Sequence, residues 1–386
     1  MKKRLFSGLL ALSLMLALGA CGLTPTPDPT ELPKPTDPTA SQKPTDPTDP
    51  PVELVNQTVS ILENTSTTFR TLGRTYERNG GLACDYSCTG IEFKAFCEGN
   101  IYLHIEATAQ AYLTVYIDGE RSEDRISVVP ETPLVRIACD LEYGEHTIMI
   151  VNQTQFPIAT MVMHSIMLTG NLMDKPADRE LFIEFYGDSI LHGSNIYKGG
   201  TSAASSDATC AFGWVAAQQL GADCSLIGRG GLGLVKSKLS YNMLDIYDLC
   251  GSISLKNVPK YDFSRQPDAV VILLGTNDYL NGGLSGTPEV YSAGVEEFIG
   301  ILREKYGAEV PIVWIYGYGS DGSDFWEVTK GTLEGLKAAG DDNIHYCHVS
   351  EAYCPKSEGG DGLHPDKKRA EIMSQEVADF LEDLLK

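Results

Sequence analysis

Residues 181–193 read LFIEFYGDSILHG, and this stretch decides the fold of the second half of the chain. Its apolar and aromatic residues up to Tyr186 are typical of a buried strand, which stops at Gly187, Asp188 and Ser189. A short turn at a strand end holds a serine hydroxyl in the open. Ser189 is therefore either a nucleophile or a turn residue, and the remaining sequence must decide.

Apolar strands alternate with helical periodicity from about residue 178 onward, which predicts an α/β domain. Pro288–Tyr306 is the clearest helix, with Thr287 as its cap, and another helix begins beside Pro365. Five strands joined by crossover helices predict an open parallel sheet, whose ligands bind at the carboxyl ends of the strands. The expected strands are 181–187, 223–228, 268–275, 311–316 and 343–349.

Residues 52–176 show a different pattern, in which short runs alternate between apolar and polar residues. This period of two predicts strands buried on one face, and Asp118-Gly119 between two such runs is a strong hairpin signal. A further turn is expected at Gly144. No segment here has a convincing helical pattern, so we expect an all-β domain, an antiparallel sandwich or jelly roll.

The first twenty-one residues have the features of a secretory signal, with Lys2, Lys3 and Arg4 before a short apolar core. The stretch LGAC that ends at Cys21 resembles the bacterial lipobox, which implies cleavage before Cys21 and attachment of a diacylglycerol to its sulfur. The alternative is an ordinary signal peptide cut nearby. Residues 22–51 are rich in proline and threonine and predict a semi-rigid spacer.

The composition limits the partners of the protein. The chain has 386 residues and a net charge of −22, so it repels phosphate backbones and anionic headgroups, and a neutral substrate is favoured. We therefore expect no nucleic-acid partner and no membrane contact beyond the N-terminal lipid. Besides Cys21 there are nine cysteines, an odd number, so at least one thiol is unpaired. The sequence does not decide whether a disulfide forms within Cys84–Cys97. Their spacing does not indicate a metal site.

A serine hydroxyl becomes a useful nucleophile only when an imidazole takes its proton and a third group orients that imidazole. The stretch GGDGLHPD, residues 359–366, follows the last predicted strand and offers His364 with Asp361 three residues before it. Since this loop also emerges at the carboxyl edge of the sheet, both residues should reach Ser189. We predict Ser189 as nucleophile, His364 as base and Asp361 as the residue that orients it.

Acyl transfer also needs donors for an oxyanion, and two further strand ends supply them. IGRGGLG, residues 227–233, follows the second strand and presents glycine amides, of which Gly231 is the best placed. LGTND, residues 274–278, follows the third strand and presents the side chain of Asn277. With the amide of Ser189, these groups would form an oxyanion hole. The chain has no Gly-x-Ser-x-Gly elbow, which argues against an α/β-hydrolase.

These four blocks, in this order, resemble the SGNH (GDSL-type) hydrolase superfamily. The preceding segment, with LGRTYERNGG at 72–81 and LEYGEHTIMI at 141–150, resembles carbohydrate esterase family 2. That family joins a β-jelly roll to an SGNH domain and removes acetyl groups from plant polysaccharides. The resemblance spans about residues 70–386 and implies a flavodoxin-like, three-layer catalytic domain. Some members hold the histidine with a main-chain carbonyl instead of an aspartate.

The resulting hypothesis divides the chain into a lipoprotein signal (1–21), a linker (22–51), a β-jelly roll (52–176) and an SGNH hydrolase domain (177–386). The protein would be exported, lipid-anchored at the bacterial cell surface, and would remove O-acetyl groups from polysaccharides or oligosaccharides without metal or cofactor. Trp326 is our candidate for stacking on a sugar ring, with a core position as the alternative. Rival functions are an SGNH lipase or thioesterase, a cell-surface glycan O-acetylesterase and a non-catalytic carbohydrate-binding protein.

Overall fold

The computed structural model describes residues 52–386 except 157, 281–287, 318–323 and 351–352. The predicted signal and linker, with Cys21, lie outside the described residues, and so does Thr287. In the part of the chain that is described, no helix is long and apolar enough to cross a membrane. Cys84, Cys88 and Cys97 are buried free thiols, so no disulfide forms within Cys84–Cys97.

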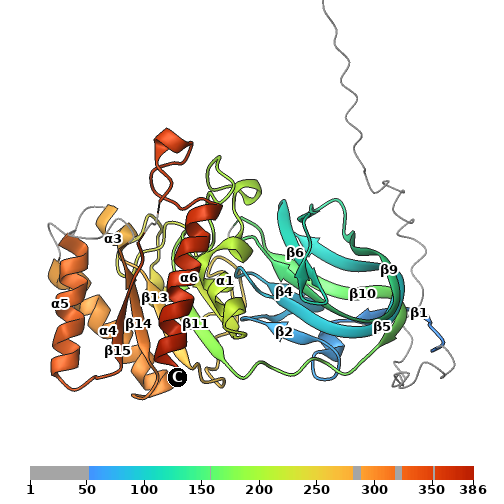
Figure 1. Ribbon diagram of the computed structural model, residues 1–386, viewed down its shortest axis with the longest axis horizontal. Helices are drawn as coiled ribbons and strands as arrows, with labels where there is room; N and C mark the ends of the chain where they lie inside the picture. The colour runs from blue at the N-terminus through green and yellow to red at the C-terminus, as the bar shows by residue number, and fades with distance from the viewer. Residues whose placement is uncertain (1–51, 157, 281–287, 318–323, 351–352) are drawn as a thin grey trace, which may run out of the picture. The chain divides into compact units, whose positions relative to one another are not determined.

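The N-terminal part is an antiparallel β-sandwich, as the period-two pattern predicts (Figure 1). Two long strands dominate it: β5 (Gly90–Ala107) pairs with both β9 (Leu134–Asn152) and β10 (Met161–Leu172). Their inward side chains, such as Ile101, Leu103 and Ile105, are fully buried in one apolar core. The other strands are β1 (Asn56–Ser60), β2 (Arg70–Leu72), β3 (Tyr76–Arg78), β4 (Gly81–Cys84), β6 (Ala111–Ile117), β7 (Glu120–Arg121) and β8 (Ile126–Val128).

Two predicted turns in this domain have different outcomes. Asp118 and Gly119 link β6 to β7 with φ angles of 53° and 88°, the left-handed backbone of a tight hairpin, so this prediction is confirmed. The turn expected at Gly144 is wrong, because β9 runs through this residue and pairs it with Cys97. The pairing of β5 with β9 is irregular instead at Gly99, where the register shifts on both sides of this residue. Such bulges bend a strand without ending it.

The C-terminal part is a parallel sheet with the order β12-β11-β13-β14-β15. Its five strands match the predicted ones to within two residues at each end. Odd and even residues face opposite layers: Val271 and Leu273 join one core, whereas Val270 and Ile272 join the other. The strands are β11 (Phe182–Gly187), β12 (Asp223–Gly228), β13 (Ala269–Leu273), β14 (Ile312–Tyr316) and β15 (Ile344–His348).

Helices cover both faces of this sheet and complete the three-layer architecture (Figure 1). α1 (Phe212–Gln219) and α6 (Lys367–Leu384) pack on one face, and α4 (Pro288–Tyr306) and α5 (Asp324–Ala338) pack on the other. α4 has the predicted bounds, and its apolar residues Tyr291, Val295 and Phe298 are buried, which confirms that helix. Two short helices, α2 (Met243–Ile246) and α3 (Thr276–Leu280), lie in the connections.

A buried ion pair joins the β-sandwich to the parallel sheet. Arg74 of the sandwich donates to Glu184 of β11 at 2.8 Å and 3.2 Å and to the hydroxyl of Tyr186 at 3.0 Å. The side chains of Arg74 and Glu184 are 1% and 0% exposed. Because two charges withdrawn from water need each other as partners, this contact fixes the sandwich against β11, the strand that precedes Ser189.

Candidate active site

Ser189 lies just beyond β11, at the place where the strand order of the sheet reverses. β11 pairs with β12 on one side and with β13 on the other, so the connections diverge and leave a crevice at the carboxyl ends of these strands. Gly187, just before the turn, leaves no room for a side chain, because a Cβ there would lie 2.8 Å from the Cβ of Leu191. The chain can therefore turn sharply after β11 and present Ser189 to the crevice.

The structure brings Ser189, His364 and Asp361 into one relay of hydrogen bonds. The Oγ of Ser189 lies 2.7 Å from Nε2 of His364, and Nδ1 of His364 lies 2.6 Å from Oδ2 of Asp361. A carboxylate beside Nδ1 favours the tautomer with the proton on Nδ1, which leaves Nε2 to accept the serine proton. This is the geometry by which a serine hydroxyl becomes a nucleophile.

Asp361 is held in place by the loop that carries it. Its Oδ1 accepts hydrogen bonds from the backbone amides of Leu363 and His364, both at 2.9 Å. Partial burial acts in the opposite direction, but the His364 side chain and these two amides hold the pKa of Asp361 below its ordinary value. The carboxylate therefore stays charged at neutral pH and faces the imidazole.

Two backbone amides beside the serine are free to bind an oxyanion. Within the described residues, neither the amide of Ser189 nor that of Gly231 donates a hydrogen bond to another group of the chain. Gly231 has φ +80°, a conformation that favours glycine, and it lines the same cavity as the serine. This arrangement agrees with the predicted positions of these two donors.

Asn277 also lines the cavity, but its side-chain amide is already engaged. Its Nδ2 donates to Oδ2 of Asp188 at 2.9 Å and to the carbonyl of Leu232 at 3.0 Å. Both neighbours are acceptors, so the amide nitrogen must face them. A substrate oxygen could receive an Asn277 hydrogen only by replacing one of these acceptors. Asp188 is 1% exposed, and burial raises its pKa to about 6.

The cavity in front of Ser189 has a volume of about 500 Å³. Two of its residues, Gln155 and Ile158, come from the connection between β9 and β10, so the β-sandwich forms part of the wall. The remaining walls belong to the loops that follow β11, β12, β13 and β15. The lining residues are Gln155, Ile158, Ser189, Thr201, Arg229, Gly230, Gly231, Lys238, Leu239, Asn277, Leu363 and His364.

Gln155 connects the sandwich directly to the glycine loop after β12. Its Oε1 accepts a hydrogen bond of 2.6 Å from the amide of Gly230, and its Nε2 donates to Oγ of Ser194 at 3.3 Å. The side chain is 5% exposed. Because Gly230 precedes Gly231, this bond helps to fix the peptide that presents the Gly231 amide to the cavity.

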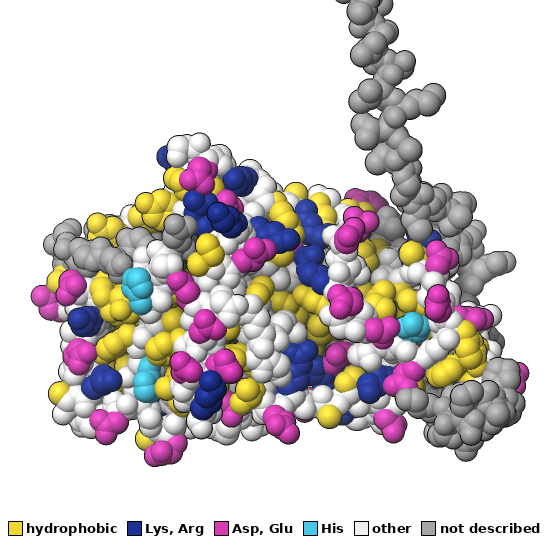
Figure 2. Space-filling view, viewed as in Figure 1, with side chains coloured by type: hydrophobic (Ala, Val, Ile, Leu, Met, Phe, Trp, Pro, Cys, Tyr) yellow, Lys and Arg dark blue, Asp and Glu magenta, His cyan; other side chains and the backbone are white. Residues whose placement is uncertain are grey.

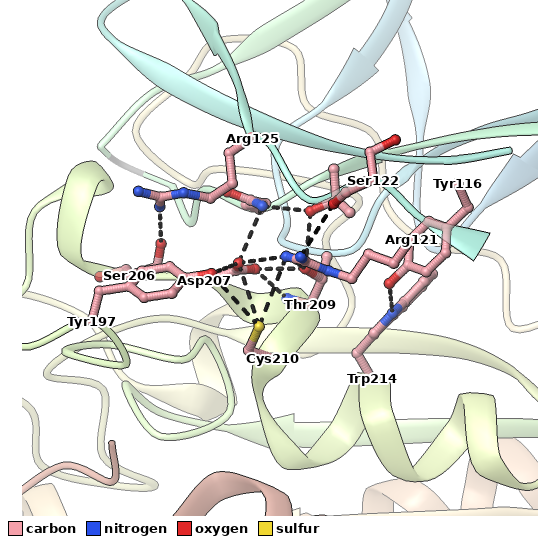
Figure 3. A network of polar contacts seen from close by, with 12 residues as sticks. Tyr116, Arg121, Ser122, Arg125, Tyr197, Ser206, Asp207, Thr209, Cys210 and Trp214 are labelled. Carbon is pink, nitrogen blue, oxygen red and sulfur yellow. Dashed lines mark hydrogen bonds and ion pairs between the residues drawn. The ribbon is translucent and has the colours of Figure 1, made fainter. Parts of the chain in front are cut away.

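A second contact with the sandwich anchors the loop that carries Thr201 (Figure 3). At its centre is the fully buried carboxylate of Asp207, whose Oδ2 accepts from Arg121 at 2.9 Å and from Tyr197 at 2.7 Å. Its Oδ1 accepts from the amide and the hydroxyl of Thr209. Arg121 comes from β7, so the hairpin predicted at Asp118-Gly119 reaches across to this wall of the cavity.

Trp326 lies away from the cavity. It is 6% exposed, its ring stacks on that of Tyr316 at 4.2 Å, and the ring of Tyr346 meets it edge-on at 5.9 Å. This position is that of a core residue and does not support the expected stacking on a sugar. His192 is also fully buried and hydrogen-bonds Ser87 through Nδ1 at 2.8 Å.

Several cavity residues were not among the predicted ones. Arg229 and Gly230 belong to the glycine-rich stretch 227–233, which the sequence already placed at the site. Gln155 and Lys238 had no such signal, because neither belongs to a motif block.

Comparisons with known proteins agree with this fold. Residues 183–377 match the family model described as GDSL-like lipase/acylhydrolase, and residues 71–176 match that of the carbohydrate esterase 2 N-terminal domain. A search of curated proteins found no match. The sequence motifs and the two family models therefore point to the same pair of domains.

Solved structures with the same fold include family two carbohydrate esterases. An active-site mutant of a family two carbohydrate esterase from Clostridium thermocellum, solved in complex with celluohexase, aligns with a TM-score of 0.75 and 19% identity over 83% of this chain and 99% of that one. The acetyl xylan esterase Est2A of Butyrivibrio proteoclasticus gives 0.75 and 20% over 86% and 99%. The chain belongs to the GDSL-like lipase/acylhydrolase family, and it is a carboxylic ester hydrolase with the N-terminal domain of carbohydrate esterase family 2.

Proposed function

We propose that this protein is a serine esterase that removes O-acetyl groups from polysaccharides or oligosaccharides. The observation that carries the proposal is the relay from Ser189 through His364 to Asp361, which ends in a cavity beside two free backbone amides. The carbohydrate esterase 2 domain and the fold shared with an acetyl xylan esterase support a glycan substrate.

In the proposed mechanism, Ser189 attacks the acetyl carbonyl carbon while Nε2 of His364 takes the hydroxyl proton. The amides of Ser189 and Gly231 stabilise the oxyanion, and Asn277 joins them if it releases one of its two acceptors. His364 then gives the proton to the departing sugar oxygen, which leaves an acetyl group on Ser189. Water, activated by His364, attacks this ester and releases acetate.

The nature of the cavity favours this reaction over that of a lipase. Its walls include polar and charged side chains, among them Gln155, Arg229 and Lys238, for which a sugar offers hydrogen-bonding partners and a fatty acyl chain does not. Two of its lining residues come from the β-sandwich, so a substrate in the cavity contacts both domains.

The test is acetate release from defined acetylated oligosaccharides. Ser189→Ala should abolish the release and the burst of acetyl-enzyme, while thermal unfolding should show that the variant remains folded. Ser374→Ala is a suitable control, because this buried serine hydrogen-bonds the carbonyl of Ala370 within α6 and does not line the cavity. Full activity of Ser189→Ala would disprove the proposal, and glycan binding without acetate release by the wild type would indicate a binding protein.

We further propose that the chain is exported and anchored through a lipid on Cys21, as the sequence at 18–21 indicates. Labelling of the protein with radioactive palmitate in a bacterial host tests this. The label should be lost in Cys21→Ala, and an unlabelled wild type would contradict the lipid anchor.

A further inference from the structure

The charged side chains that line the cavity have the opposite sign to the chain as a whole. The sequence has 52 acidic and 30 basic residues, and acidic side chains are scattered over the visible face in Figure 2. Among the described residues that line the cavity, however, no Asp or Glu occurs, and two are Arg229 and Lys238. Two cations beside the nucleophile are unexpected in such an acidic protein.

Lys238 has no electrostatic partner among the residues that the structure describes. Its ammonium group forms no ion pair or hydrogen bond with any described residue, and its side chain is exposed. Its backbone amide donates to the carbonyl of Gly231 at 3.1 Å, and its Cβ would lie 3.5 Å from a Cβ placed on Gly231. The lysine side chain therefore starts directly beside a proposed oxyanion donor.

Arg229 is oriented by neutral groups only. Its Nη1 donates to the hydroxyl of Tyr241 at 2.7 Å and its Nε to the carbonyl of Gly230 at 3.2 Å, which leaves Nη2 without an acceptor among the described residues. Four other arginines at the domain boundary each face a carboxylate: Arg70, Arg74, Arg121 and Arg265. Arg78 and Arg125 instead donate to backbone carbonyls across the boundary. The guanidinium of Arg229 is thus held in position, and its Nη2 hydrogens can be donated to a ligand.

We propose that Arg229 and Lys238 form a subsite for a carboxylate of the substrate, so that the preferred substrates are acetylated glycans with a uronic acid next to the acetylated sugar. Guanidinium and ammonium groups are the usual protein partners of carboxylates. A cavity of about 500 Å³ accommodates more than the acetyl group, so neighbouring sugar units reach these side chains. This inference rests on the proposed esterase function and names its substrate class.

The experiment compares two substrates that differ in one group. The first is an acetylated xylo-oligosaccharide with a glucuronic acid branch, and the second is the same compound with the carboxyl group reduced to an alcohol. At 0.1 M NaCl the wild type should have a kcat/KM for acetate release about twofold to fivefold higher on the acidic substrate, since an exposed ion pair has about this effect.

Two lysine variants test the assignment. Lys238→Gln should bring the ratio of the two kcat/KM values at least halfway to one. Lys236→Gln is the matched control, because this lysine is exposed in the same loop but does not line the cavity, and the ratio should stay at the wild-type value.

Three results would overturn the inference or its basis. Equal kcat/KM values of the wild type on both substrates would show that no carboxylate subsite exists. An equal loss on both substrates in Lys238→Gln, with an unchanged ratio, would mean that the cation stabilises the oxyanion instead. Absence of acetate release from both substrates would refute the esterase function itself, which is a different outcome from a loss of preference.

Discussion

Replacement of Asp361 by Asn tests the relay most sharply, because the loop dictates how an asparagine would be oriented. Oδ1 of Asp361 accepts from the amides of Leu363 and His364. An asparagine must keep its carbonyl oxygen at this position, so its NH₂ group faces Nδ1 of His364. Nδ1 must then accept, and the ring proton moves to Nε2. The imidazole would donate to Ser189 and lose its capacity as a base.

The expected loss follows from this change of tautomer. The wrong tautomer lowers kcat of serine hydrolases about 10⁴-fold, or about 5.4 kcal/mol of transition-state stabilisation. The fold should be retained, because asparagine can still accept from both amides. The Asp361 side chain is 34% exposed, so loss of its ion pair should change the free energy of unfolding by less than about 1 kcal/mol.

The assay is the steady-state rate of acetate release, with urea unfolding of the same preparation. Asp366→Asn serves as control: it too replaces a carboxylate near the start of α6, but this residue caps the helix and does not contact His364. Its kcat should stay within about twofold of the wild type. A loss of less than tenfold in Asp361→Asn would show that another group, such as a main-chain carbonyl, orients the imidazole.

Three further predictions concern neighbouring groups. Gln155→Leu should lower kcat at least about tenfold, because the Gly230 amide loses its acceptor, whereas Gln155→Glu retains an acceptor and should keep most of the activity. Arg74→Met should lower the free energy of unfolding in urea by about 3–5 kcal/mol, and the double variant with Glu184→Leu should recover most of it. The pKa of Asp188 is raised from 3.8 to about 6, so the folded state loses stability as the pH rises through this window. Relative to Asp188→Asn, the wild type should lose about 2 kcal/mol of unfolding free energy between pH 4 and 6, and a constant difference would contradict this.

The relay could be predicted from the sequence because its members lie at strand ends. Once the strands of a parallel sheet are recognised, their carboxyl ends must share one edge, and Ser189, Gly231, Asn277 and His364 all follow such ends. Residues far apart in the chain are thus placed together without any knowledge of their contacts. The strand pattern is strong because these strands are buried on both faces and read as apolar runs.

Other features depend on tertiary contacts that leave no periodic signal. Gln155 meets Gly230 across 75 positions of sequence and from another domain, so no local pattern indicates the contact. Trp326 is flanked by a loop and a helix in the sequence, and only its stacking on Tyr316 places it in the core. A glycine such as Gly144 is typical of a turn, but pairing with Cys97 of the neighbouring strand β5 keeps it within β9.

The net charge and the cavity charge act over different distances, which gives a last prediction for the carboxylate subsite. The Debye length is about 30 Å at 0.01 M salt, so the net charge of −22 should then repel an acidic glycan. At 0.1 M it is about 10 Å, which screens most of the surface but less of the contact with Lys238. At 1 M the Debye length is about 3 Å, so salt screens the contact with Lys238 as well. The ratio of kcat/KM for the acidic and the reduced substrate should therefore pass through a maximum near 0.1 M. A steady fall of this ratio from 0.01 M to 1 M would mean that the surface charge does not influence the approach of the substrate, and that Arg229 and Lys238 alone set the field at the cavity.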